Sequence, residues 1–324
     1  MARWRPRLRD NVGLMASRLS TLPSIMSTPL FQRGTLWSAV VARSAHALAC
    51  GALRPIETAQ TVIDDCGVSF VVRQVSSLAL KPSIQTASPR PFIDPFLPYD
   101  PDLFVADISG THLALLNKFN VLDRHLLIVT RAFEPQDALI ALDDFEAWFA
   151  CLQEFEALGF YNGGREAGAS QPHKHMQLVP LPLGDSGQRL PIARLIEATT
   201  FDGPVGRLPG LPFDHAFARL TPPPHERAAA QALDCYRMLL DVAGVRAIRV
   251  DGRLHHDTPY NLLVTPHWML LVPRSAESAE GISINSLGFA GSLFVKSAAQ
   301  CETLRRIGPM SVLRRVGLPR RDSA

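Results

Sequence analysis

Three polar side chains recur at alternate positions in one short stretch of the chain: His173, His175 and Gln177. Successive side chains of a β-strand point to opposite faces, so on a strand these three share one face. A neutral imidazole is an available nucleophile near pH 7, and one placed beside a phosphate can attack phosphorus. The pattern therefore predicts phosphoryl-group chemistry. The alternatives are one half of a metal site or an exposed edge strand.

A glycine-rich segment, residues 163–171, directly precedes this stretch and contains Gly168, Ser170 and Gln171. Glycine lets backbone N–H groups approach an anion closely, and the serine and glutamine side chains add donors. Phosphoryl transfer depends mainly on such positioning and charge stabilisation. Two histidines alone do not make a zinc site, and no third cysteine or histidine lies at standard spacing in the sequence. We therefore predict no metal held by the protein at this motif.

The composition limits the class of protein. Hydrophobic residues make up 47% and charged residues 19% of the 324 positions, enough for a sizeable core in one or two domains. No run of eighteen apolar residues occurs, so we expect no membrane-spanning helix and no membrane partner. The net charge is +3, but five arginines lie within residues 1–25 and the other charges nearly cancel. Bulk charge therefore predicts no nucleic-acid partner.

The first 30 residues are predicted to be a leader outside the folded body, and we expect it to be disordered. Residues 1–25 are rich in arginine and serine and contain one acid, which resembles an organelle transit peptide. The other interpretations are a disordered N-terminal segment that has no role, or a start codon placed too early, with Met26 as the true first residue. The five cysteines are scattered and never form C-x-x-C, which favours a reducing compartment. We expect the cytoplasm, with an organelle as the alternative if the leader is a transit peptide.

Hydrophobic periodicity predicts the elements that must position the motif. A helix is expected over residues 36–52 and a proline-punctuated loop over 82–101. Strands are expected over 69–75, 112–119, 125–130, 160–162, 173–182, 213–220, 260–265 and 268–272, the last two as a hairpin. A second helix is expected over residues 226–242. This order of elements favours an α+β fold.

One more helix is predicted in front of the glycine-rich segment. Asp143 is expected to be its N-cap, with Glu146 three residues later completing a capping box, and Gly159 is expected to end it. We attribute the adjacent acids Asp143 and Asp144 to helix capping. His255, His256 and Asp257 resemble a metal or catalytic cluster, but they precede a strand in what reads as a polar turn, so we expect a solvated loop.

Several motifs together resemble one family. Residues 162–164, 168–171 and 173–177 are similar to the signature of the ATP adenylyltransferases, also called diadenosine tetraphosphate phosphorylases, of the histidine-triad superfamily. Residues 115–121 and 125–131 resemble the central strands of that family. Residues 259–265, 268–275 and 285–291 resemble its C-terminal region. The likeness runs from about residue 36 to about residue 317.

The resemblance implies a fold and a reaction. The fold would be a histidine-triad-like antiparallel sheet with flanking helices, with a core over residues 31–190 and a C-terminal region over 191–324 that completes the substrate site. The reaction would be reversible phosphorolysis of diadenosine tetraphosphate to ATP and ADP. His175 would attack the α-phosphorus and hold AMP, His173 would orient it, and Gln177 would bind the transferred group. A carboxamide cannot activate water, so Gln177 fits transfer rather than hydrolysis.

The resemblance also implies partners and supporting residues. The partners would be dinucleoside polyphosphates, ATP, ADP and phosphate, with a divalent cation, expected to be Mg²⁺, bound mainly through the nucleotide. His125 follows the family pattern, although a core histidine is an equally open interpretation. The substrate-binding residues implied are Lys81, Asn117, Lys118, Asn162, Gly168, Ala169, Ser170, Gln171, Asn285, Ser286, Leu287, Ser292 and Lys296.

Two rival functions remain open on the sequence. A hexose-1-phosphate uridylyltransferase shares the H-x-H-x-Q pattern, although the cysteine and histidine zinc ligands frequent in that family are absent at recognisable spacing. A catalytically silent nucleotide-binding sensor is the rival from another class, and the intact His173, His175 and Gln177 count against it. The sequence leaves the oligomeric state and the base preference open.

Overall fold

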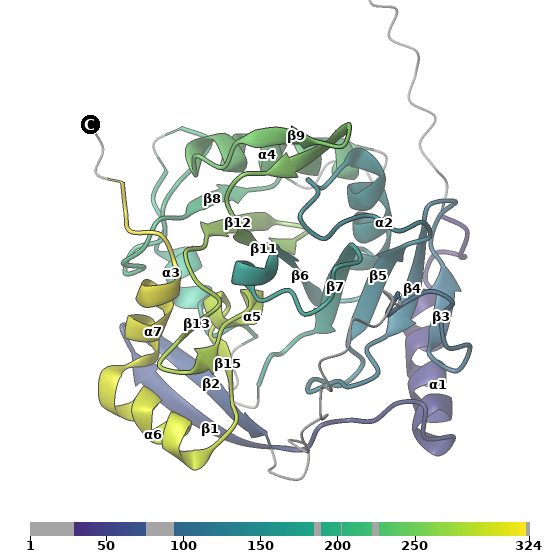
Figure 1. Cartoon of the computed structure of the whole chain (residues 1–324), viewed down its shortest axis with the longest axis horizontal. Helices are drawn as coiled ribbons and strands as arrows, with labels where there is room; N and C mark the ends of the chain where they lie inside the picture. Colours follow the sequence, from purple (N-terminus) through teal and green to yellow (C-terminus); the bar gives the residue numbers. More distant parts are fainter. Residues whose placement is uncertain (1–28, 76–93, 185–188, 202, 222–226, 322–324) are drawn as a thin grey trace, which may run out of the picture.

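A large antiparallel sheet lies at the centre of the computed structural model, with helices on its faces (Figure 1). The structure describes residues 29–75, 94–184, 189–201, 203–221 and 227–321. The predicted leader therefore lies almost entirely outside the described residues, and so does Lys81. The mixture of helices with an antiparallel sheet confirms the predicted α+β class.

The main sheet has eight strands, and every neighbouring pair in it is antiparallel. In spatial order the strands are β3 (Phe104–Asp107), β4 (His112–Leu116), β5 (Leu126–Thr130), β7 (His175–Pro180), β6 (Ala157–Gly163), β11 (Tyr260–Thr265), β12 (Trp268–Pro273) and β8 (Ala216–Arg219). The strand of the histidine motif, β7, is thus central. Strands from both sides of residue 190, the boundary predicted between core and C-terminal region, belong to this one sheet, because β6 pairs with β11.

Apolar clusters cover both faces of this sheet. On one face α2 (Leu142–Leu152) and α4 (Ala228–Val242) pack on side chains such as Met176 and Leu178. On the other face Val179 belongs to a cluster that includes α7 (Pro309–Val316). Alternate residues of β7 thus enter opposite cores, which confirms the predicted strand alternation. The first helix, α1 (Leu36–Ala49), packs beside β3 at one edge (Figure 1).

A second, three-stranded sheet contains strands from the N-terminal and C-terminal regions of the sequence. In it β15 (Ser292–Val295) pairs in parallel with β2 (Val68–Val75). The remaining elements are β1 (Thr58–Asp65), the 3-10 turn η2 (Arg165–Ala167), α3 (Ala193–Glu197), β9 (Ala247–Val250), β10 (Arg253–His256), β13 (Ser278–Ala279), β14 (Ile282–Ser283), α5 (Ser286–Phe289) and α6 (Ala298–Ile307). Among the described residues no helix is both long and apolar enough to cross a membrane.

The predicted limits of the helix before the glycine-rich segment are wrong. The N-cap is Ala141 rather than Asp143, and the Asp144 carboxylate accepts the backbone N–H of Ala141 at 2.7 Å. The helix ends at Leu152, and Gly159 lies inside β6. A Cβ atom at Gly159 would lie 2.7 Å from Trp148 Nε1, so the glycine here admits the tryptophan against the strand and does not end a helix.

Candidate active site

His175 is held with one ring nitrogen bonded and the other facing a cavity. It is 4% exposed, and its Nδ1 lies 2.7 Å from the backbone oxygen of His173. A carbonyl oxygen only accepts, so the ring proton sits on Nδ1 and the lone pair sits on Nε2. Burial lowers the pKa of His175 to about 4, so the ring is neutral at pH 7. This is the tautomer and charge that a nitrogen nucleophile requires.

Gln177 and His125 form a second polar chain beside this nucleophile. The Nδ2 group of Asn117 lies 3.1 Å from His125 Nδ1, and His125 Nε2 lies 3.0 Å from Gln177 Oε1. Burial lowers the pKa of His125 to about 4, so this neutral ring accepts from Asn117 and donates to Gln177. The Gln177 oxygen is therefore used, and its NH₂ group remains to donate into the cavity. His125 is both a core histidine and a residue of the site.

His173 lies fully buried behind the nucleophile, between two acceptor groups. Its Nδ1 lies 2.8 Å from a carboxylate oxygen of Asp94, and its Nε2 lies 2.9 Å from Thr130 Oγ1. Partial burial raises the pKa of Asp94, but hydrogen bonds from His173 and two backbone N–H groups outweigh this and lower it overall. The ring of His173 is thereby fixed, and with it the backbone carbonyl that sets the tautomer of His175.

A buried amide and a buried guanidinium hold the loop that precedes β7. Gln136 accepts the backbone N–H of His175 at 2.9 Å and donates to the backbone oxygen of Asn162 at 2.9 Å. Arg274 donates to the backbone oxygens of Ile284 at 3.0 Å and of Ala167, in the glycine-rich segment, at 3.4 Å, and also to the Asn261 side chain. These bonds tie the glycine-rich segment, the catalytic strand and the C-terminal region into one unit.

The nucleophile cavity, as we call the space in front of His175, has a volume of about 620 Å³. Its walls combine apolar side chains with amide and hydroxyl groups, and the ring of Phe96 packs edge-on to His175 with centroids 5.0 Å apart. Its lining includes Tyr99, Leu103, Leu115, Asn117, Lys118, Leu127, Asn162, Ser170, Gln171, His175, Gln177, Asn285, Leu287 and Phe294. Apolar walls with a few donors suit an aromatic base joined to a phosphate.

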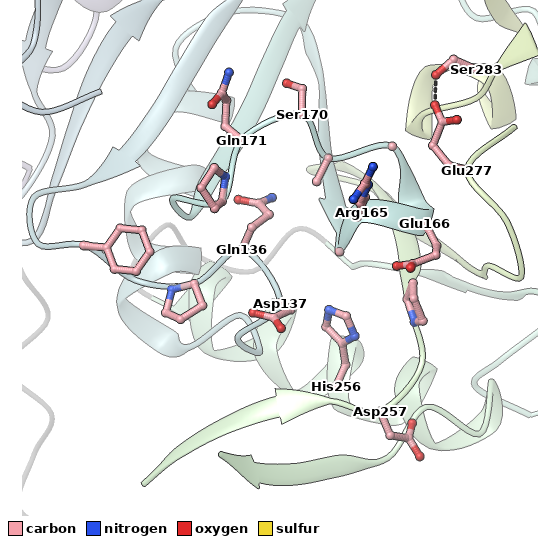
Figure 2. Close-up of a pocket in the computed structure, with 17 residues that line it drawn as sticks. Gln136, Asp137, Arg165, Glu166, Ser170, Gln171, His256, Asp257, Glu277 and Ser283 are labelled. Carbon is pink, nitrogen blue, oxygen red and sulfur yellow. Dashed lines mark hydrogen bonds between the residues drawn. The ribbon is translucent and has the colours of Figure 1, made fainter. Parts of the chain in front are cut away.

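A larger cavity of about 1010 Å³ adjoins the nucleophile cavity at the glycine-rich segment, and the two share Gly168, Ser170 and Gln171. Figure 2 shows this larger cavity with Ser170 and Gln171 on its wall. We call it the acidic cavity because four carboxylates line it: Asp137, Glu166, Asp257 and Glu277.

His256 projects from β10 into this acidic cavity (Figure 2). Its side chain is 8% exposed, and neither ring nitrogen has a hydrogen-bond partner in the structure as described. Burial lowers its pKa to about 4. The solvated loop expected for residues 255–257 is wrong for His255 and His256, which lie buried in β10. This strand pairs with β9 and also bonds to residues 137–139 through its backbone.

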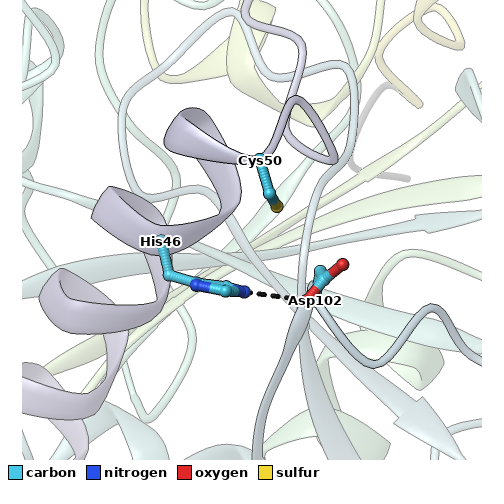
Figure 3. Close-up of side chains that lie close together, drawn as sticks. All are labelled: His46, Cys50 and Asp102. Carbon is cyan, nitrogen blue, oxygen red and sulfur yellow. Dashed lines mark hydrogen bonds and ion pairs between the residues drawn. The ribbon is translucent and has the colours of Figure 1, made fainter.

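The acidic side chains of this cavity do not converge on one point. Within the residues that the structure describes, the one group of three ligand atoms close enough to hold a metal is His46, Cys50 and Asp102, on α1 and the loop before β3 (Figure 3).

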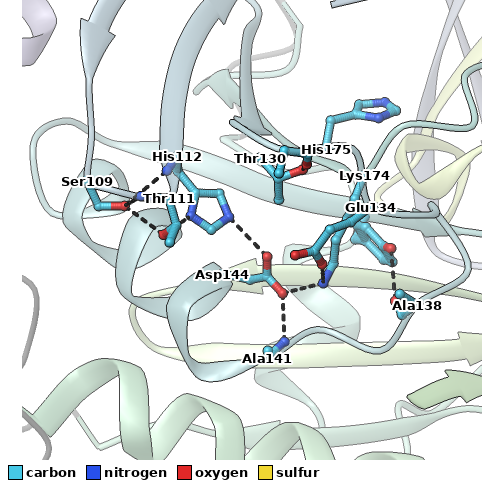
Figure 4. Close-up of polar contacts among 12 residues, drawn as sticks. Ser109, Thr111, His112, Thr130, Glu134, Ala138, Ala141, Asp144, Lys174 and His175 are labelled. Atoms are coloured by element: carbon cyan, nitrogen blue, oxygen red, sulfur yellow. Dashed lines mark hydrogen bonds and ion pairs between the residues drawn. The ribbon is translucent and has the colours of Figure 1, made fainter. Parts of the chain in front are cut away.

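Lys174, the residue directly before β7, belongs to a buried ionic network on the side of α2 (Figure 4). Lys174 is 1% exposed, and its Nζ lies 2.5 Å from Asp144 and 3.3 Å from Glu134. The other carboxylate oxygen of Asp144 lies 3.0 Å from His112 Nε2. Burial raises the pKa of Asp144, but His112 and Lys174 outweigh this and lower it overall. Helix capping thus explains only part of the role of Asp144, which anchors the catalytic strand to α2.

The structure brings most of the predicted site residues together, and their individual roles remain predictions. The nucleophile cavity includes Asn117, Lys118, Asn162, Gly168, Ser170, Gln171, His175, Gln177, Asn285 and Leu287, and Ala169 lines the acidic cavity.

Four predicted residues lie elsewhere. His173 and Ser286 are buried behind the walls, where the Ser286 hydroxyl donates to the Tyr161 backbone oxygen at 2.7 Å. Ser292 accepts from Arg73 at 2.7 Å, and Lys296 is exposed; neither lines the two cavities.

No sequence pattern indicated Asp94, Gln136, Arg274 or the cavity-facing position of His256. Asp94 precedes Pro95 within the segment predicted as a proline-rich loop, where an isolated acid next to proline is an ordinary feature. His256 was visible as a cluster member, but its burial depends on the β9–β10 ribbon, which the periodicity did not predict.

Two family models match the chain in succession. The Ap4A phosphorylase N-terminal domain matches residues 26–198, and the ATP adenylyltransferase C-terminal domain matches residues 209–319. Diadenosine 5′,5′′′-P1,P4-tetraphosphate phosphorylase 2 of Saccharomyces cerevisiae is 29% identical over 257 residues, covering 70% of this chain and 76% of that protein. Protein APA1 of the same yeast is 28% identical over 262 residues, covering 74% of this chain and 80% of that protein.

Solved structures show the same fold. The crystal structure of yeast Ap4A phosphorylase Apa2 superposes with a TM-score of 0.73 at 24% identity, covering 91% of this chain and 98% of that one. Apa2 in complex with Ap4A superposes with a TM-score of 0.72 at 24% identity, covering 90% of this chain and 99% of that one. The match of the first family model over more than half of the residues is decisive, and the chain belongs to the Ap4A phosphorylase family.

Proposed function

We propose that this protein is a nucleotidyltransferase that converts diadenosine tetraphosphate (Ap4A) and phosphate reversibly into ATP and ADP through AMP bound to His175. The observation that carries the proposal is the fixed tautomer of His175, whose Nε2 lone pair opens into the nucleophile cavity. Membership of the Ap4A phosphorylase family supplies the substrate.

The reaction proceeds in two displacements. Nε2 of His175 attacks the α-phosphorus, the bond to the bridging oxygen breaks, and ATP leaves. An oxygen of phosphate then attacks the same phosphorus, ADP leaves, and the imidazole is restored. The ring becomes positively charged while it carries AMP, and the Nδ1–H bond to the His173 oxygen stabilises that charge. No proton has to be removed before the first attack, because the neutral ring already presents a lone pair.

Gln177 decides which acceptor completes the reaction. His125 donates to its oxygen, which directs the NH₂ group toward the phosphoryl oxygens. An amide donates hydrogen bonds but has no titratable proton, so it holds the phosphoryl group without activating water. This arrangement supports transfer to phosphate over hydrolysis.

The two cavities divide the substrate between them. The AMP half fits the nucleophile cavity, where Phe96, Leu103 and Leu127 offer an apolar wall for adenine. The leaving half passes over the shared glycine-rich segment toward the acidic cavity. Four carboxylates outweigh the one lining arginine, Arg165, and disfavour phosphate there. This cavity therefore fits the second nucleoside, whose base or hydroxyl groups can bond the unpartnered nitrogens of His256.

We also propose that Mg²⁺ enters with the polyphosphate and neutralises part of its charge. The carboxylates of the acidic cavity are too dispersed to form a cage for Mg²⁺ by themselves, so the polyphosphate and water would supply most of its ligands. We further propose a cytoplasmic location, which five free cysteines support.

Product analysis with Ap4A in the presence and absence of phosphate tests this function. We expect equal amounts of ATP and ADP with phosphate and very slow turnover without it. Formation of AMP and ATP at the same rate in both conditions would show a hydrolase instead. UDP-hexose and hexose 1-phosphate, offered in parallel, test the uridylyltransferase, and binding of Ap4A without any product would reveal a sensor.

A further inference from the structure

Three side chains of different chemistry converge on the outer face of α1. His46 lies in the last turn of α1, and Cys50 is the C-cap residue four positions later, so the two side chains lie on one side of the helix end (Figure 3). Asp102, in the loop before β3, lies opposite, with its Oδ1 2.8 Å from His46 Nε2. One ligand atom from each residue lies within 4.8 Å of the other two.

We infer that His46, Cys50 and Asp102 form a binding site for a zinc-like divalent cation, independent of the proposed enzymatic reaction. A nitrogen, a sulfur and a carboxylate oxygen are the donor set that Zn²⁺ accepts, and water would complete the tetrahedron. Mg²⁺ does not fit, because it prefers oxygen ligands only. The site is not part of either cavity.

The adjustment that binding needs is small. Ligand atoms around tetrahedral zinc lie about 3.5 Å apart. The 2.8 Å pair of His46 Nε2 and Asp102 Oδ1 would therefore open slightly, and the Cys50 sulfur, within 4.8 Å of both, would move toward them. The side chains of His46 and Asp102 are 52% and 48% exposed, so both can rotate, and the exposed ion pair that they give up contributes little stability. The negative end of the α1 dipole also favours a cation at this position.

The surrounding charges set the limits of the site. Hydrogen bonds from His46, and then from Cys50, lower the pKa of Asp102, which keeps it an anion. Arg43, one turn earlier, donates to the backbone oxygen of Pro101 at 3.3 Å, and its charge opposes a dication. We therefore expect moderate affinity that rises with pH, because binding displaces the thiol proton of Cys50.

A bound cation would fasten a segment that also serves the active site. The segment 94–103 begins with Asp94, which holds His173, continues through Phe96, which packs on His175, and ends beside Asp102. Zinc at this end would tie the segment to α1 and raise the melting temperature of the full chain.

Cobalt titration of the reduced full-length protein tests the site, because a Co²⁺–thiolate bond gives a near-ultraviolet charge-transfer band. We expect one Co²⁺ per chain with this band, displaced by one equivalent of Zn²⁺. Cys50→Ser should abolish the band, and His46→Ala or Asp102→Asn should weaken affinity by on the order of 100-fold.

Matched controls are available at exposed positions away from the proposed site. Cys66→Ser removes the other exposed cysteine, and Asp143→Asn removes an exposed acid elsewhere; both should bind like the wild type. The melting temperature should rise with Zn²⁺ in the wild type and in Cys66→Ser but not in Cys50→Ser. Absence of the band, or a band that survives Cys50→Ser, would overturn the assignment.

Discussion

The two cavities hold their histidines in different ways. In the nucleophile cavity both ring nitrogens of His125 are bonded, and His175 has one nitrogen bonded and one free for phosphorus. In the acidic cavity neither nitrogen of His256 has a partner among the described groups. All three rings are neutral, since burial lowers the pKa of each to about 4.

This difference in hydrogen bonding suits the nucleophile cavity to the chemical step and the acidic cavity to ligand recognition. Partners in the nucleophile cavity fix which nitrogen carries a proton, so the reactive tautomer exists before substrate arrives. A buried polar group without a partner costs about 1–3 kcal/mol, and a ligand that bonds His256 recovers that cost. In the proposed function, the nucleophile cavity is thus preorganised for reaction, whereas the acidic cavity would be completed by the nucleoside that binds His256.

Removing the nucleophile should have the largest effect on turnover of any change in either cavity. His175→Ala should lower turnover of Ap4A by on the order of 10⁴-fold or more, because no other described group offers a lone pair at the phosphorus. Chromatography of the reaction mixture would measure the rate at which ATP and ADP form. His267→Ala, in the turn between β11 and β12, is the matched control and should retain full turnover. Substantial activity in a folded His175→Ala protein would refute the assigned role.

Removing the support of His173 should have a smaller effect. Asp94→Asn replaces a charged acceptor with an amide, which loosens the ring and the carbonyl that sets the tautomer of His175. We expect kcat to fall by about 10²-fold with little change in KM. Asp123→Asn, at an exposed acid, is the control. A change confined to KM would mean that Asp94 contributes to substrate binding instead.

Changing Gln177 should redirect the products rather than stop the reaction. In Gln177→His an imidazole can activate water, and we expect hydrolysis to gain on the order of 10²-fold relative to phosphorolysis. The ratio of AMP to ADP at fixed phosphate measures this partition. Gln153→His, on the surface, should leave it unchanged. An unaltered ratio in an active Gln177→His protein would place water exclusion in the cavity walls.

The smallest expected effect concerns stability at acid pH. The unfolded chain protonates His256 below about pH 6.5, whereas the folded chain resists protonation down to about pH 4. The free energy of unfolding should therefore fall as the pH drops through this window. His256→Phe should remove about 2 kcal/mol of the loss between pH 7.5 and pH 5, as measured by urea denaturation.

A matched pair of variants tests the assignment of this acid effect. His267→Phe changes a histidine of the β11–β12 turn and should keep the wild-type pH dependence. Identical acid sensitivity in His256→Phe and the wild type would show that His256 is not held neutral by its surroundings.

Sequence patterns predicted the elements that are defined by their own side chains. Strand alternation placed His175 and Gln177 on one face and Lys174 on the other, and apolar runs located β4, β5, β11 and β12. The predicted end of the helix at Gly159 is wrong because Leu158 fits the helical spacing by chance. Residues 157–163 form β6, in which Gly159 leaves room for Trp148.

The missed parts of the site depend on contacts between distant segments. Asp94 reaches His173 across 79 positions of sequence, and Arg274 reaches the Ala167 backbone across 107. No local spacing records such pairs. His256 also escaped prediction, because an exposed and a buried histidine look alike until the pairing of β9 with β10 is known.

The central claim is that Nε2 of His175 carries AMP between the two displacements. The most direct test is to incubate the protein with adenine-labelled Ap4A without phosphate, quench it in base, and locate the label by peptide mass spectrometry. We predict a base-stable, acid-labile AMP adduct on His175 that disappears as ADP when phosphate is added before the quench. An adduct on another residue, or product formed by phosphate with no adduct at any time, would contradict the account.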